Sequence, residues 1–148
     1  LMEVWPMLGF GSVGLILWQN VRVLLLALVL GVFTFGVLGV LPLMATMAVT
    51  GYLVSLLSMN GITAAPIMAL LLPHGIFEIP AAILATAAVL RAGAVIAAPT
   101  AGKTIGEVWL GTLADWCKVM LGVIIPLLIA AAMVEMWVTP RIAAWILG

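Results

Sequence analysis

The residues with the clearest potential for chemistry lie within residues 73–80, which read Pro-His-Gly-Ile-Phe-Glu-Ile-Pro. His74 is the only histidine of the chain, and Glu78 is one of five acidic residues. Four residues apart on a helix, these two side chains share one face, a spacing that is seen in pairs of metal ligands. Two ligands do not make a metal site. Glu135 is the best candidate for a third, because it also lies inside an apolar stretch.

Three roles are open for this candidate cluster of His74, Glu78 and Glu135. The first is a buried structural contact, in which the histidine and the glutamate hydrogen-bond to each other or to nearby backbone carbonyls. The second is a site that responds to a proton or a substrate, and the third is a metal or catalytic centre. A zinc protease of the HExxH type is not supported by a chain with one histidine. We favour the structural contact, with no catalytic residue and no metal assigned, because each unsatisfied polar group in lipid costs several kcal/mol.

The segments around this motif are apolar and too long for a single straight crossing. Residues 62–72 and 81–90 carry no charge. One helix from Ile62 to Ala97 would be about 50 Å long, whereas the hydrocarbon core of a bilayer is about 30 Å thick. Each proline inside a helix leaves a carbonyl without its N–H partner. Pro73, Gly75 and Pro80 therefore predict a break, which either a broken transport-type helix or a re-entrant hairpin would provide.

The composition identifies an integral membrane protein. Of 148 residues, 67% are hydrophobic and only 7% are charged, and the formal net charge is zero. Soluble domains carry about 25% charged residues. The charge balance excludes nucleic-acid binding, which requires a basic patch. Cys117 is the only cysteine, so no internal disulfide framework exists. We expect a single membrane domain over residues 1–148, with an incomplete N-terminus because the chain starts at Leu1 and runs directly into an apolar stretch.

The sequence predicts an all-α transmembrane bundle with about four membrane-embedded segments. The expected spans are residues 21–41, a short stretch over 43–57, the interrupted region over 62–97, and 119–138, which Pro126 should kink. Asn20 is a good N-cap residue for the first span, and Arg22 would mark the interface. Helix packing is expected from small residues, which let another helix approach closely: Ala27, Gly31 and Gly36.

Charged residues after the third span predict an amphipathic helix on the membrane surface. Glu107, Asp115 and Lys118 share one helical stripe within residues 104–118, so we expect this segment to lie at the interface before the last span. Arg91 either snorkels to the interface or pairs with an acid inside the bundle. The basic residues divide evenly between the two expected sides and give no orientation.

Several motifs together resemble the stage II sporulation protein M family of polytopic membrane proteins. The most specific is residues 72–81, which contain the histidine–glutamate motif. Weaker matches are Asn20-Val21-Arg22 before a glycine-bearing helix, Asn60-Gly61 in a turn, Ile125-Pro126-Leu127-Leu128, Glu135, and Thr139-Pro140. The chain departs from the family pattern in residues 89–93, where the family usually has a glycine before the leucine, and in the helix expected ahead of residue 20, which is absent or truncated.

The resemblance implies a multi-pass protein of the cell (inner) membrane of a bacterium or archaeon. In spore formers the family's namesake works with cell-wall hydrolases that remodel peptidoglycan during engulfment. Similar proteins occur in organisms that make no spores, some beside ABC-transporter components. We therefore expect a non-enzymatic scaffold or subunit of a membrane complex, with no cofactor. The alternatives are the membrane subunit of an exporter whose ATPase is a separate chain, since no GxxxxGK loop is present, and an intramembrane hydrolase. Self-association is left open.

Overall fold

A computed structural model describes residues 10–98 and 102–147, and within its helices it does not describe the side chains of Phe10, Gly11, Ser12, Leu70, His74, Ala143, Ile146 and Leu147. Within these residues the chain is all-helical, as predicted. The elements are α1 (Phe10–Phe33), η2 (Val37–Val40), α2 (Leu41–Met59), α3 (Ala64–Ala97), α4 (Ile105–Val119), the π-helical turn η3 (Met120–Ile124), α5 (Ile125–Trp137) and α6 (Thr139–Leu147).

Four helical stretches are long and apolar enough to cross a membrane, which confirms the predicted number of embedded segments. They are Val13–Phe33, Val37–Met59, Gly75–Ala97 and Ile105–Ile142. Two boundaries differ from the predictions. The first span starts upstream of Asn20, because the apolar helix continues through residues 13–19 without a break, so Asn20 does not cap it. The second is longer than the predicted 15 residues, because η2 and the first turn of α2 extend it.

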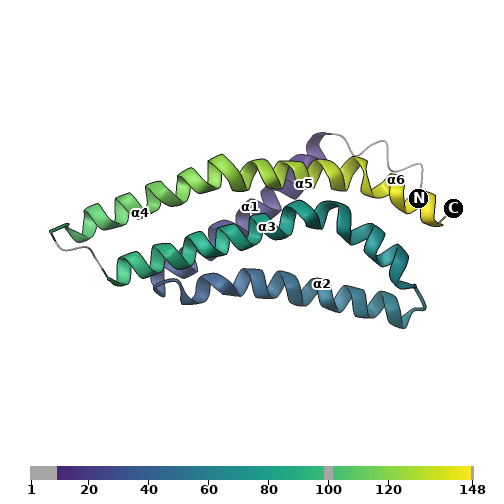
Figure 1. Ribbon diagram of the computed structural model, residues 1–148, viewed down its shortest axis with the longest axis horizontal. Coiled ribbons are helices and arrows are strands. Elements are labelled where there is room, and N and C mark those ends of the chain that lie inside the picture. Colours follow the sequence, from purple (N-terminus) through teal and green to yellow (C-terminus); the bar gives the residue numbers. More distant parts are fainter. Residues whose placement is uncertain (1–9, 99–101, 148) are drawn as a thin grey trace.

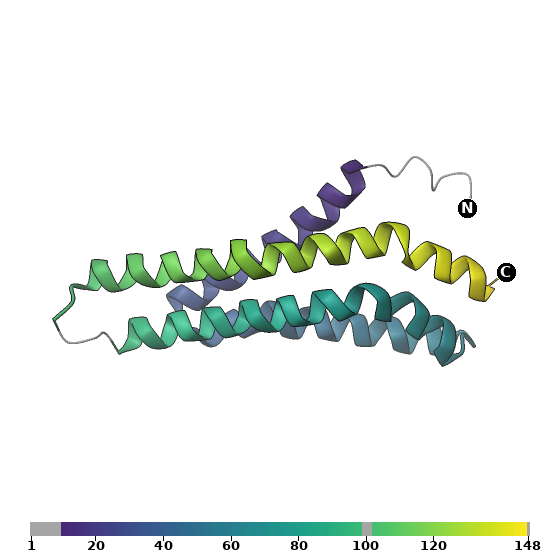
Figure 2. The same cartoon turned by 45° about the horizontal axis from the view of Figure 1, so that its top comes forward.

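Helix α3 lies at the centre of the bundle (Figures 1 and 2), with α1, α2, α4, α5 and α6 all in contact with it. α4, η3, α5 and α6 follow one another along α3 in the opposite direction. α2 lies at the periphery, and Pro42 is the only buried residue of this helix. The hairpin of α3 and α4 extends past the turn between α1 and α2 (Figure 1).

The predicted interruption around Pro73 and Pro80 is a bend within one helix. α3 runs through both prolines over 34 residues and bends in its first half (Figure 1). At about 1.5 Å per residue this helix is about 51 Å long. Proline removes one backbone hydrogen bond and pushes the preceding turn aside, which bends a helix without ending it where neighbouring helices hold both halves.

The last span has a comparable irregularity ahead of Pro126. The π-helical turn η3 ends at Ile124, and Pro126 lies in the first turn of α5. A π turn shifts the hydrogen-bond pattern by one residue and so accommodates the missing proline N–H. The segment over 104–118, predicted as a separate surface helix, is α4, and η3 joins it directly to the span.

Glycines allow α1 and α3 to cross closely. Val89 of α3 is 1% exposed, and a Cβ atom placed on Gly31 or Gly39 would meet its Cγ1 atom. One turn further along α3, a Cβ atom on Gly93 would overlap the backbone carbonyl carbon of Phe35 and the backbone nitrogen of Gly36. Gly36 itself has a φ angle of 94°, which favours glycine. The crossing therefore depends on glycines from two distant segments.

The remaining core is built from apolar side chains of the same helices. Ala27 is buried, as its place on the small-residue face of α1 suggests. The main buried cluster is formed by residues of α1, α3, α4, η3 and α5: Leu24, Ala81, Ala85, Val89, Trp116, Met120, Ile124 and Leu128.

Candidate functional site

Glu78 lies in a cleft between α1, α2 and α3, with a volume of about 150 Å³. The other polar side chains that line the cleft are Asn20 of α1 and Thr46 and Thr50 of α2. Gly75 lies one turn before Glu78 on α3 and adds no side chain, which leaves room at this point. The structure therefore groups a carboxylate, an amide and two hydroxyls from three helices. We call this the Glu78 cleft.

The polar residues of the Glu78 cleft lie within three of the candidate membrane spans. Arg91 of α3 and Asp115 of α4 form an ion pair at 3.7 Å, and Glu78 and Leu128 line the cleft together. Thirteen residues separate Arg91 from Glu78, and thirteen separate Asp115 from Leu128. Each interval corresponds to about 20 Å of helix, against a hydrocarbon core of about 30 Å. If the ion pair marks one face of the bilayer, the carboxylate is about two-thirds of the way across.

The two threonines present acceptor oxygens to the cleft. Thr46 donates its hydroxyl hydrogen to the carbonyl oxygen of Pro42 at 2.9 Å, and Thr50 donates to that of Thr46 at 3.0 Å. A hydroxyl whose hydrogen is committed to its own helix can still accept. With Asn20 able to donate and accept, the cleft can bind groups of either kind.

A second, wider groove of about 520 Å³ runs between α1 and α2 and shares Asn20, Val23, Thr46 and Thr50 with the Glu78 cleft. Its other walls are formed by Gln19 and by apolar residues: Leu26, Leu30, Leu41, Pro42, Ala45 and Val49. The cleft and the groove therefore share part of their walls, and the groove lies beside the cleft on the lateral surface of the bundle.

The other two members of the predicted cluster are placed differently. His74 lies in α3, but its side chain is outside the described residues. Glu135 is exposed near the end of α5 and does not line the Glu78 cleft. We predicted that Glu135 is buried beside Glu78, and this prediction is wrong. Glu135 lies seven residues, or about 10 Å, beyond Leu128 along α5. Among the described residues, no group of three histidine, cysteine or acidic side chains could hold a metal ion.

The residues predicted as interfacial divide into two groups. Asn20 and Arg22 lie within the first span, at the depth of the Glu78 cleft, because α1 starts upstream of them. Asp115 instead joins the two cations Arg91 and Lys118, at 3.7 Å and 3.1 Å. Arg91 thus pairs with an acid, but at the outer surface, where 71% of its side chain is exposed.

α4 begins with a reciprocal capping arrangement that fixes where the charged stretch starts. The backbone N–H and the hydroxyl of Thr104 donate to Glu107 Oε2 at 2.8 and 2.9 Å, and the backbone N–H of Glu107 donates to Thr104 Oγ1 at 3.3 Å. This capping box satisfies N–H groups that the first turn of a helix leaves without partners. It is readable in the sequence as Thr-x-x-Glu.

Sequence reasoning missed Gly93, as well as the two threonines of the cleft. Gly93 lies in the stretch where the chain departs from the family pattern, and its role depends on α3 crossing the turn after α1. Thr46 and Thr50 are four residues apart on one face of α2, which is a detectable signal in a helix with few polar residues.

Comparisons with known proteins agree with this architecture. The sequence profile described as stage II sporulation protein M matches residues 8–140. An uncharacterized protein of the archaeon Methanocaldococcus jannaschii is 32% identical over 132 residues, which cover 89% of this chain and 73% of that protein. No solved structure matches the chain. With four candidate membrane spans and a profile match over most of its length, the chain belongs to the stage II sporulation protein M family of multi-span membrane proteins.

Proposed function

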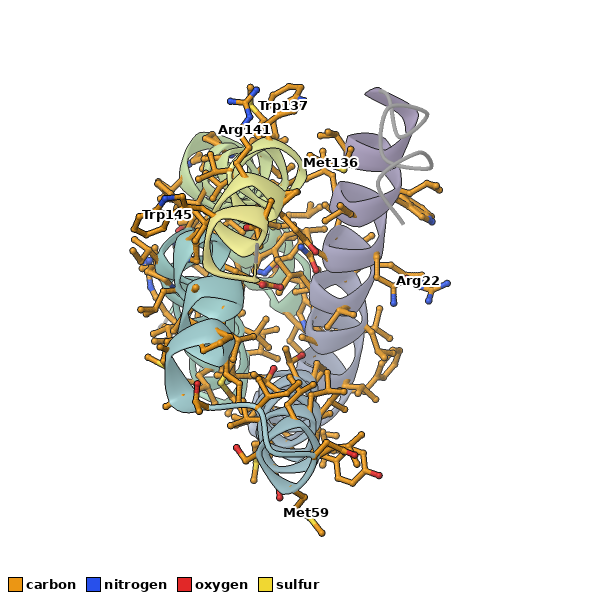
Figure 3. The ribbon with its side chains drawn as sticks, turned by 90° about the vertical axis from the view of Figure 1, so that its right-hand side faces the viewer. Arg22, Met59, Met136, Trp137, Arg141 and Trp145 are labelled. Atoms are coloured by element: carbon orange, nitrogen blue, oxygen red, sulfur yellow. The ribbon has the colours of Figure 1, made fainter. Side chains whose placement is uncertain are left out.

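We propose that this protein is a non-enzymatic scaffold subunit of a complex in the cell membrane, and that α1 and α2 form the side that meets its partner. The observation that carries the proposal is Arg22. This exposed side chain extends from α1 away from the other helices (Figure 3). Among the described residues it donates a hydrogen bond only to its own helix, to Gln19 Oε1 at 3.1 Å.

The depth of Arg22 makes exposure to lipid unfavourable. It lies between Asn20 and Val23, which line the Glu78 cleft, and so about 10 Å inside the nearer face of the apolar layer. An arginine in the centre of a membrane helix costs about 2.5–3.5 kcal/mol even on the most permissive scale. A carboxylate on the helix of another membrane protein would offset this cost, and polar groups across helix interfaces are a recognised means of association.

The groove beside Arg22 has a lining suited to a helix of another membrane protein. Its walls are mostly apolar, and Asn20, Thr46 and Thr50 are available for hydrogen bonds. α2 has almost no buried residue of its own, so this helix can pack against another protein without unfolding the core. A scaffold that joins membrane proteins needs such a lateral surface.

A transporter subunit is the second candidate, and the Glu78 cleft is the observation that favours it. A carboxylate that lines a cleft between membrane helices is typical of substrate or proton paths. In that case the energy for transport would come from an ATPase on another chain. The family's association with cell-wall hydrolases in spore formers favours the scaffold, with a hydrolase as partner.

The test compares wild-type protein and the Arg22→Ala variant, each purified from membranes of the source organism together with its bound partner. We expect the partner recovered with wild-type protein in mild detergent to be reduced by about tenfold or more, because about 1.4 kcal/mol corresponds to a factor of ten. Arg141→Ala is the matched control, since Arg141 is exposed on α6 at the end of the bundle (Figure 3), and it should leave the partner bound. Mass spectrometry that identifies a cell-wall hydrolase supports the scaffold, whereas an ATPase supports the transporter subunit. Equal recovery with Arg22→Ala and wild type would contradict the proposal.

A further inference from the structure

A second charged cleft lies at the opposite end of the apolar layer from α6, between the last turns of α3 and the first turns of α4. It has a volume of about 170 Å³. Two cations line it, Arg91 from α3 and Lys103 from the connecting loop, together with two acids of α4, Glu107 and Asp115. We call this the hairpin cleft. It shares no lining residue with the Glu78 cleft or with the groove between α1 and α2.

The two acids of the hairpin cleft accept hydrogen bonds from other side chains or the backbone, whereas the two cations make fewer such contacts. Glu107 accepts two hydrogen bonds from Thr104, and Asp115 accepts one from Lys118 at 3.1 Å. Arg91 reaches Asp115 only at 3.7 Å, and its guanidinium has five donors. Lys103 makes no hydrogen bond or ion pair with any other residue that the structure describes. Arg91 and Lys103 therefore have hydrogen-bond donors left for an anion.

The rest of the lining is suited to an amphiphile. Thr112 adds a hydroxyl. The other side chains of the lining include small apolar ones: Ala88, Ala92, Val95, Val108 and Val119. Ala88 and Val119 continue from Arg91 and Asp115 toward the core, and the other three lie between this ion pair and the loop. A free inorganic anion would make no use of these walls. A molecule with an anionic head and an apolar body would use both.

The depth of the cleft matches the phosphate layer of a bilayer. Twenty residues, or about 30 Å of helix, separate Asp115 from Glu135 on the last span, which equals the thickness of the hydrocarbon core. Three of the chain's five basic residues, Arg91, Lys103 and Lys118, lie at this end. Short basic loops favour the cytoplasmic side, and the cytoplasmic leaflet carries the anionic lipids.

We propose that the hairpin cleft binds the phosphate of an anionic phospholipid, with Arg91 and Lys103 as its cationic ligands and Thr112 as a hydroxyl donor. The acyl chains run along the apolar wall of α3 and α4. Bound in this way, the lipid bridges the two helices of the hairpin, whose end extends past the turn between α1 and α2 (Figure 1).

The test measures lipid retention by native mass spectrometry of protein purified from nanodiscs that contain phosphatidylcholine with or without phosphatidylglycerol. Wild-type protein should retain phosphatidylglycerol in preference to phosphatidylcholine, and Arg91→Gln with Lys103→Gln should reduce this retention by about tenfold or more, since each basic residue near the surface contributes about one kcal/mol. Arg141→Gln is the control. It removes an exposed basic side chain from α6, at the opposite end of the bundle, so it should retain the lipid.

Three results would overturn the proposal. They are equal retention of the two lipids by wild type, equal loss with Arg141→Gln and with the double variant, and displacement of the bound species by inorganic phosphate alone, which would identify a free-anion site. Lys103→Gln alone keeps the test decisive if the double variant does not fold, because Lys103 lies in the loop before α4, outside any helix.

Discussion

Gly93→Ala is expected to destabilise the bundle by about 3 kcal/mol, at the upper end of what overpacking costs. The new Cβ atom would overlap the backbone carbonyl carbon of Phe35 and the backbone nitrogen of Gly36. Backbone atoms cannot rotate away as the tip of a flexible side chain can, and Gly36 is already held at a φ angle of 94°. The two segments must therefore separate, which also exposes Val89. The measurement is resistance to unfolding by heat or by sodium dodecyl sulfate in mixed micelles, followed by tryptophan fluorescence.

The same substitution elsewhere should have the opposite sign. Gly51 lies in α2, and a Cβ atom there would meet nothing within 4 Å. Alanine is favoured over glycine in a helix by about 1 kcal/mol, so Gly51→Ala should leave stability unchanged or raise it. A Gly93→Ala protein that resists unfolding as well as wild type would show that α3 does not cross the turn after α1 as closely as described.

Glu78→Ala is expected to impair assembly of the protein as well as any activity. The carboxylate lies about 20 Å along α3 from the Arg91–Asp115 ion pair, in a cleft with Asn20, Thr46 and Thr50. Removing this half-buried carboxylate takes a hydrogen-bond acceptor away from the polar groups around it, at a cost of up to about 1–3 kcal/mol. We expect a lower yield of folded protein, an earlier unfolding transition and loss of co-purifying partner. His74→Ala, on the same face of α3 by its spacing, is expected to behave in the same way.

Glu135→Ala provides the control for this prediction. It removes the same side chain from an exposed position on α5 that does not line the cleft, so it should unfold like wild type. If Glu78→Ala assembles and unfolds like wild type and only a turnover is lost, the structural role of Glu78 is wrong. The proton- or substrate-responsive role would then be the better account.

Local sequence properties were sufficient to predict the helical spans and the positions of several of their ends. Hydropathy summed over about 20 residues predicts a membrane helix without reference to any other segment, and four such helices are present. Asn60 and Gly61 predicted the turn before α3, where Gly61 has a φ angle of 80°. Pro73 and Pro80 predicted an irregular α3, although proline alone does not decide between a bend and a break.

Positions within the bundle could not be predicted in the same way. Asn20 has the chemistry of an N-cap but lies in the middle of α1, because the helix ends where its apolar neighbours end and not at the first polar residue. Glu135 is as isolated among apolar residues as Glu78, yet it is exposed. Which face of α1 or α5 is covered depends on helices from distant parts of the chain. Because both helices are apolar on most faces, the sequence does not show which face is buried.

The sequence by itself therefore determined that this is a helical, multi-span membrane protein of the stage II sporulation protein M family, because hydropathy, proline positions and the histidine–glutamate motif are local properties. Only the tertiary structure decided that Gly31, Gly39 and Gly93 form one close crossing, and that Glu78 shares a cleft with α1 and α2. Lipid offers no strong preference for one apolar face over another, so small differences in shape and a few polar groups select the packing.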